Sequence, residues 1–247
     1  VDWFKLQLEN LFKTVDKRLV LILILYLALG FILLGYYQYQ INPDGVGYIQ
    51  TAEKYLSGDF QGAVDAYWGP LLSWLLIPFL YFNQAPTYAL YVAKILSIII
   101  GLFTIIGIRQ LSYQFELDET VRTTILLIMV PVILYFSLIV ITPDLLVVCL
   151  LVYYLSIIFN PKYPDRLSNG LLCGVLGAFA FFAKSYMFPF FIVQFLLLNL
   201  LHYHYRGDYP KIKITRNMLI GFLAFLLVSG VWIGLISSKE EKLTFGT

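Results

Sequence analysis

Runs of apolar residues recur along the whole chain, each about as long as a membrane is thick, and they constrain the fold more than any other feature. A helix needs roughly 20 mostly apolar residues to cross a bilayer. We assign seven such spans, at 18–36, 87–111, 121–141, 143–159, 168–183, 185–203 and 217–236. Of the 247 residues, 60% are hydrophobic and 13% are charged, whereas a soluble domain carries about 25% charged residues. We therefore predict an all-α polytopic membrane protein in which residues 1–247 form a single transmembrane module.

Two further apolar segments differ from the spans. Residues 3–15, within an N-terminal segment 1–17, place apolar side chains on one stripe and charged ones opposite, which is typical of an interfacial helix. Residues 67–82 are apolar but short and are broken by Pro70 and Pro78. We expect this second segment to lie along the membrane surface.

The distribution of basic residues predicts the orientation. With a cytoplasmic N-terminus, twelve of the 17 Lys and Arg residues fall in inner segments, four fall in outer segments, and Lys94 lies inside a span. Because cytoplasmic segments are enriched in Lys and Arg, this orientation is favoured. It puts the longest loop, residues 37–86, on the outer face, where the patterns at 45–56 and 67–82 predict two membrane-lying helices.

Four ionisable residues are predicted to meet at this outer face. Asp44 follows the first span, Asp144 begins the fourth, Lys184 lies between the fifth and sixth, and Lys94 lies about 10 Å deep in the second. Charged groups at a membrane are costly, so they are functional candidates. Structural alternatives stay open: a helix cap for Asp44, a first-turn acid for Asp144, an ordinary span-end lysine for Lys184 and a snorkelling side chain for Lys94.

The order of these features resembles the GT-C glycosyltransferases, in the branch of protein O-mannosyltransferases and aminoarabinose transferases. The resemblance covers essentially the whole chain and rests on four segments, Pro43–Tyr48, Tyr67–Leu75, Thr142–Leu146 and Ala183–Tyr186. It implies an enzyme that moves a sugar from a polyprenyl-phosphate donor to a lipid, glycan or protein acceptor. It also implies a cytoplasmic or endoplasmic-reticulum-type membrane with the active site outside. We expect the chain to be the N-terminal part of a longer enzyme.

The resemblance also assigns roles to residues. Asp44 matches the first-loop acid that acts as general base, and Asp144 matches a second acid that organises metal or substrate. Lys184 matches a basic residue facing the lipid phosphate. Some relatives have Lys-Pro-Pro, with the lysine near the lipid phosphate, where this chain has Trp68-Gly69-Pro70. The resemblance then leaves Lys94 or Lys184 to supply the positive charge at the phosphate.

Further candidates follow from the chemistry of the substrate. Aromatic faces stack on sugar rings, so we expect sugar contacts from the outer aromatic residues Tyr48, Tyr67, Trp68 and Tyr186. Two carboxylates are plausible ligands of a hard cation, which leaves open Mg²⁺ or Mn²⁺ held by Asp44 and Asp144.

Two other functions stay open. A secondary transporter or flippase for a lipid-linked or small polar substrate would show internal repeats or paired interrupted helices, and the sequence has neither. A non-catalytic membrane scaffold would not need residues 44, 144 and 184 to converge. The net charge of +2 is small and dispersed, which argues against nucleic acid as a partner.

Overall fold

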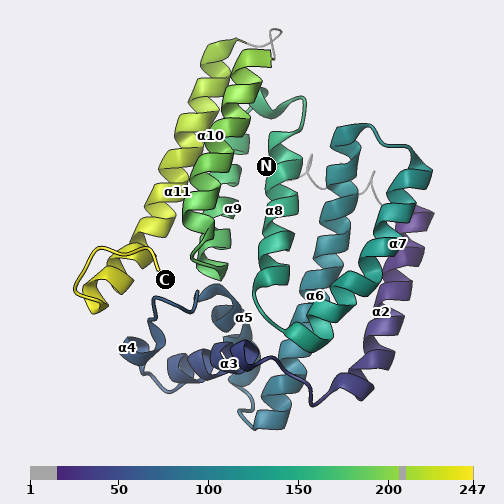
Figure 1. Cartoon of the computed structure of the whole chain (residues 1–247), viewed down its shortest axis with the longest axis vertical. Helices are drawn as coiled ribbons and strands as arrows, with labels where there is room; N and C mark the ends of the chain where they lie inside the picture. Colours follow the sequence, from purple (N-terminus) through teal and green to yellow (C-terminus); the bar gives the residue numbers. More distant parts are fainter. Residues whose placement is uncertain (1–15, 206–209, 247) are drawn as a thin grey trace.

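The computed structural model describes residues 16–205 and 210–246, and in these ranges the chain is built of helices without a strand (Figure 1). The bundle consists of α2 (Lys17–Tyr37), α6 (Pro86–Ser112), α7 (Glu119–Tyr135), α8 (Asp144–Ile158), α9 (Leu167–Ala183), α10 (Met187–Tyr205) and α11 (Lys211–Lys239). Each of these helices overlaps one predicted span, and α7 ends six residues before the end of the span predicted at 121–141. The interfacial helix predicted at 3–15 lies outside the described residues.

Five of the bundle helices are long and apolar enough to cross a membrane. They are α2, α6 with the following 3₁₀ turn η1 (Tyr113–Phe115), α7 with the following π-helical turn η2 (Phe136–Val140), α10 and α11. Helices α8 and α9 are apolar but have 15 and 17 residues, about 22 and 26 Å at 1.5 Å per residue. The structure therefore supports an all-α, membrane-embedded protein with five helices of spanning length in its described part.

Residues 38–85 form three helices that lie across one end of the bundle, which we call the loop end (Figure 1). They are α3 (Pro43–Leu56), α4 (Phe60–Ala63) and α5 (Leu71–Leu80). Helix α3 packs its apolar face on α5, and the Ser73 hydroxyl donates a 2.8 Å hydrogen bond to the Tyr48 carbonyl. The two predicted loop helices correspond to α3 and α5, whereas the four-residue α4, capped by Asp59, was not predicted.

Glycines bring α9 and α11 into close contact. A Cβ added to Gly174 would lie 2.1 Å from the Gly221 carbonyl oxygen, and one added to Gly170 would lie 2.3 Å from the Asn217 carbonyl oxygen. Small residues allow such close backbone packing in membrane helices. Because α9 ends at Ala183, this packing fixes the position from which Lys184 extends.

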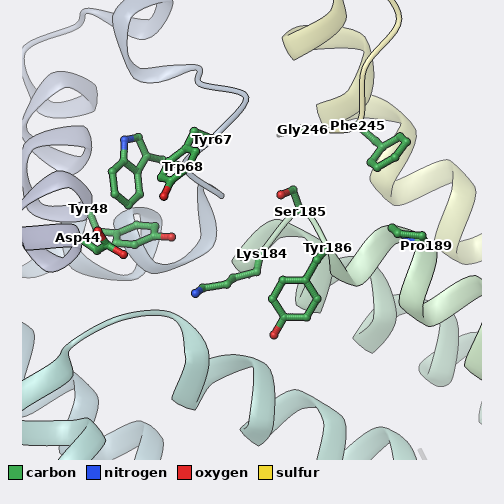
Figure 2. A pocket seen from close by; sticks show the side chains of 10 residues that line it. All are labelled: Asp44, Tyr48, Tyr67, Trp68, Lys184, Ser185, Tyr186, Pro189, Phe245 and Gly246. Carbon is green, nitrogen blue, oxygen red and sulfur yellow. The ribbon is translucent and has the colours of Figure 1, made fainter. Parts of the chain in front are cut away.

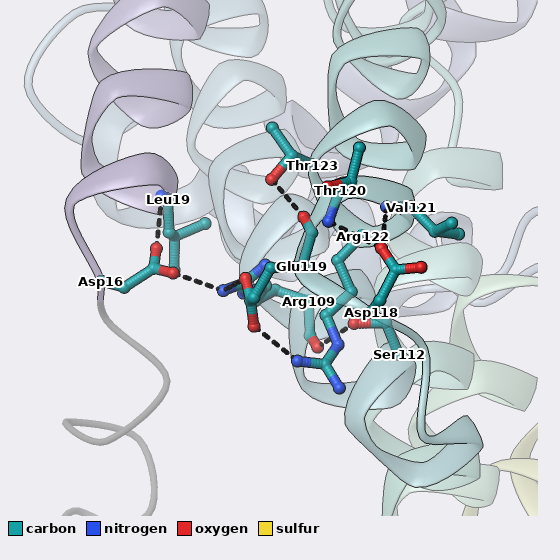
Figure 3. A network of polar contacts seen from close by, with 10 residues as sticks. All are labelled: Asp16, Leu19, Arg109, Ser112, Asp118, Glu119, Thr120, Val121, Arg122 and Thr123. Atoms are coloured by element: carbon teal, nitrogen blue, oxygen red, sulfur yellow. Dashed lines mark hydrogen bonds and ion pairs between the residues drawn. The ribbon is translucent and has the colours of Figure 1, made fainter.

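The opposite end of the bundle is held by a buried arginine (Figure 3). The Arg109 side chain is 1% exposed, and its Nη2 lies 2.6 Å from Asp16 Oδ2 and 2.6 Å from Glu119 Oε2. Asp16 also caps α2 by accepting a hydrogen bond from the Leu19 amide, and Glu119 pairs with Arg122. One guanidinium thus joins the ends of α2, α6 and α7.

Candidate functional site

A cavity of about 420 Å³ opens at the loop end, between the loop helices and the α9–α10 turn (Figure 2). Its lining residues come from α3, the α4–α5 loop, the α9–α10 turn, the first turn of α10 and the chain after α11. They are Asp44, Tyr48, Tyr67, Trp68, Lys184, Ser185, Tyr186, Pro189, Phe245 and Gly246. Six of them are residues that the sequence analysis proposed.

Asp44 lies in the first turn of α3, with its carboxylate on the cavity wall. The cap of this helix is Asn42, whose side-chain oxygen accepts a 2.9 Å hydrogen bond from the Asp44 amide. In the described part of the chain, the Asp44 carboxylate itself makes no hydrogen bond or ion pair. The Asp44 carboxylate therefore does not cap the helix and is available to a ligand.

Lys184 extends from the α9–α10 turn across the cavity toward Asp44 and Tyr48 (Figure 2). Its ammonium lies 2.8 Å from Asp144 Oδ1 and 3.0 Å from Asp144 Oδ2, and the Thr142 hydroxyl also donates to this carboxylate. Asp144 is the first residue of α8 and does not line the cavity. The predicted residues 44, 144 and 184 thus converge: Lys184 lines the cavity together with Asp44 and pairs with Asp144.

Two aromatic residues pack around Trp68 to form one wall of the cavity. The Trp68 ring centroid lies 4.9 Å from that of Tyr48 and 4.6 Å from that of Tyr67, both in edge-to-face geometry. Asp65 fixes this loop by accepting hydrogen bonds from the Tyr67 and Trp68 amides. Burial, with the negative charges of Asp144 and Asp44, raises the pKa of the Tyr48 phenol, so its hydroxyl stays protonated at neutral pH.

The loop that carries Trp68 is seated on the end of α9 through Gly69. A Cβ at Gly69 would lie 2.4 Å from the Phe182 carbonyl oxygen and 2.5 Å from the Ala183 carbonyl oxygen. Only glycine allows this approach, because real Cβ atoms do not come so near to backbone oxygens. The Gly69 contact therefore fixes the aromatic wall relative to Lys184.

The chain after α11 closes one side of the cavity, which the sequence analysis did not predict. The Phe245 ring stacks on Phe188 at 5.2 Å between centroids. At the end of α11, the Lys239 ammonium donates to the Gln61 and Val64 carbonyls, which ties this end of the helix to the loop that contains α4. Ser185 and Pro189 were also not predicted as lining residues. No periodicity or charge pattern marks these positions in the sequence.

Lys94 does not line this cavity, although the sequence analysis expected it there. Its side chain is 0% exposed, and its ammonium donates to the backbone carbonyls of Gln40 and Leu138. Its carbon chain does not snorkel to the surface either. Of the two expected cations, Lys184 is the one at the cavity.

The predicted cation ligands do not form a ready metal centre. In the described ranges, no group of three or more His, Cys, Asp or Glu side chains could hold a metal ion. Both Asp144 oxygens already lie within 3.0 Å of the Lys184 ammonium. A divalent cation would have to displace the ammonium, so no chemical step is assigned to a metal.

Comparison of the chain with protein-family models, with curated proteins and with solved structures finds no match. The function is therefore inferred from the cavity and its residues.

Proposed function

We propose that the chain is the seven-span transmembrane module of a GT-C-type glycosyltransferase, which moves a sugar from a polyprenyl-phosphate donor to an acceptor at the extracytoplasmic face. One observation carries the proposal: a carboxylate, Asp44, which has no partner among the described residues, and a cation, Lys184, line the same cavity at the loop end of an apolar helical bundle. A lipid-linked donor needs such a site, because its tail lies among apolar helices while its polar head group reaches the membrane surface.

The two charged groups suit the two halves of glycosyl transfer. Asp44 accepts the proton of the acceptor hydroxyl, whose oxygen forms a bond to the anomeric carbon as the bond from that carbon to the phosphate oxygen breaks. The leaving group is the lipid phosphate, which gains negative charge. Lys184 stabilises that charge electrostatically, and the ion pair with Asp144 holds the ammonium in position.

The rest of the cavity suits a single sugar ring. Its volume of about 420 Å³ lies at the small end of ligand pockets, which measure about 300–1,000 Å³. The protonated hydroxyl of Tyr48 can donate to a sugar oxygen, while Tyr67, Trp68 and Tyr186 offer aromatic faces. The positive-inside bias supports a cytoplasmic N-terminus, with the loop end on the outer side of a cytoplasmic or endoplasmic-reticulum-type membrane.

The test is transfer of radiolabelled sugar from polyprenyl-phosphate donors, in membranes that carry the full-length protein, with Asp44→Asn compared with wild type. Loss of a general base lowers the rate by about 10²–10⁴-fold, so we expect Asp44→Asn to lose transfer at an unchanged protein level. The matched control is Asp59→Asn, because Asp59 caps α4 in the same loop, does not line the cavity, and asparagine caps about as well as aspartate.

Two results would count against the proposal. Full transfer by Asp44→Asn would show that another group is the base. Absence of transfer by the wild type from any hexosyl or pentosyl donor would overturn the transferase proposal itself and favour a transporter or scaffold.

A further inference from the structure

Lys94 is a buried cation that the proposed mechanism does not use. It lies in α6 with 0% exposure, and no acidic side chain in the described ranges pairs with it. Its ammonium instead donates to two backbone carbonyls, those of Gln40 and Leu138. A buried charge is retained only where specific groups compensate for its lost hydration.

The compensation comes from the ends of two helices. Gln40 belongs to the turn that follows α2, where its amide donates to the Tyr37 carbonyl, and Leu138 lies in η2 at the end of α7. The C-terminal end of a helix carries about half a negative charge and favours a nearby cation. The Lys94 ammonium thus bonds to one carbonyl in η2 and to one just beyond the end of α2, in place of a carboxylate.

Both bonded segments lead into the helices that carry the two acids, at the loop end (Figure 1). Gln40 precedes the cap and first turn of α3 with Asp44, and Leu138 precedes the start of α8 at Asp144. The two segments also line a second cavity of about 360 Å³, at residues 39–42 on one segment and 135, 139 and 140 on the other. Side-chain packing therefore leaves a gap between them, and the Lys94 ammonium is bonded to both sides.

The connection before α8 is strained, which makes such a restraint necessary. Ile141, a β-branched residue, has φ 46°, in the left-handed region, and a conformation of this kind persists only where its surroundings enforce it. Its carbonyl oxygen would lie 2.8 Å from a Cβ at Gly45, so it packs directly on the first turn of α3. The spacing of the two acids depends on this contact.

We propose that Lys94 is a positioning residue, which holds the α2–α3 and α7–α8 connections together through the Gln40 and Leu138 carbonyls and so sets the place of Asp44 relative to the Asp144–Lys184 pair. Its effect on catalysis rests on the proposed function. The connection between the two segments does not rest on the proposed function, and it can be measured in the absence of any substrate.

The experiment is hydrogen–deuterium exchange of the full-length protein in lipid nanodiscs, comparing wild type with Lys94→Met, which keeps the length of the side chain and removes its donors. Losing bonds worth about 1 kcal/mol each speeds local opening by about fivefold or more. We expect that increase in peptides covering 39–48 and 137–146, and none in α9 or α11. The matched control is Thr104→Val, a buried polar residue of the same helix whose hydroxyl donates to the Ile100 carbonyl.

Transfer kinetics provide the second readout. We expect Lys94→Met to lower kcat more than it raises the donor KM, because the acids are misplaced while the cavity that binds the sugar persists. Lys94→Gln, which keeps one donor group, should fall between Lys94→Met and wild type in both measurements.

Other results would overturn either the positioning role of Lys94 or the proposed function. Unchanged exchange at 39–48 and 137–146 would overturn the proposal. It would also be overturned if exchange rose throughout the bundle, or if neither Lys94 variant folded while Thr104→Val did, because Lys94 would then serve the fold as a whole. Local loosening in a protein that transfers no sugar would leave the positioning of the two segments intact and refute only the proposed function.

Discussion

At the scale of single residues, replacing Lys184 tests whether the Lys184–Asp144 pair serves stability or chemistry. The two side chains are 26% and 36% exposed, and partly exposed ion pairs contribute about 0–1 kcal/mol. We predict that Lys184→Met lowers the free energy of unfolding by less than about 1 kcal/mol but lowers kcat for transfer by about 10²-fold or more. Thermal unfolding and initial rates measure the two effects.

The control for this variant is Lys242→Met, which removes the same charge from an exposed site at the loop end that does not line the cavity. Its transfer rate should equal that of the wild type. A large fall in stability of Lys184→Met, matched by an equal fall in the amount of active protein, would instead assign Lys184 to the fold.

The sequence located most of the cavity wall but not the surroundings of Lys94. Asp44 and Lys184 could be placed because each lies next to the end of a predicted span, and sidedness follows from basic residues. Lys94 could be given a depth from its position along α6, but its bonds depend on where two helices end in space. The lining residues Phe245 and Gly246 reach the cavity through a chain reversal after α11 that no sequence pattern predicts.

At the scale of elements, apolar runs predicted the helices and missed the irregular turns between them. Helix α11 begins at Lys211, six residues before the predicted span, because a helix continues into polar residues where the apolar pattern has ended. The π-helical turn η2 and the left-handed Ile141 lie inside a run in which Ser137 is the one polar residue between Ile125 and Ile141. Composition therefore predicts the crossing segments, whereas backbone geometry at the site depends on tertiary contacts.

The glycine contact between α9 and α11 gives an element-scale prediction. Gly174→Ala places a methyl group 2.1 Å from a backbone oxygen of α11, so the helices must separate, which costs about 1–3 kcal/mol in overpacked cores. We expect a lower unfolding temperature and slower transfer, because α9 carries Lys184 at its end. Gly230→Ala is the control: a Cβ there has nothing within 4 Å. Equal unfolding temperatures for the two variants would contradict close packing of α9 on α11.

At the scale of the whole molecule, the two ends of the bundle differ in chemistry. The loop end holds the cavity and an available carboxylate, whereas the other end is closed by the Arg109 network, in which buried and half-buried charges neutralise each other. A site for an extracytoplasmic acceptor is useful only if the loop end faces outward. Orientation is therefore the global property on which the proposed function depends.

Cysteine labelling with a membrane-impermeant maleimide tests this orientation. The native Cys149 and Cys173 are buried, so background labelling should be low. Gln61→Cys in α4 and Thr120→Cys in α7 introduce exposed thiols at opposite ends of the bundle without changing any charge. In intact cells or sealed spheroplasts we predict labelling of Gln61→Cys, with labelling of Thr120→Cys only after permeabilisation, because twelve of the 17 basic residues then lie on the inner side. The reverse pattern would put the cavity in the cytoplasm, where Asp44 and Lys184 would need a donor and an acceptor presented from the inner leaflet.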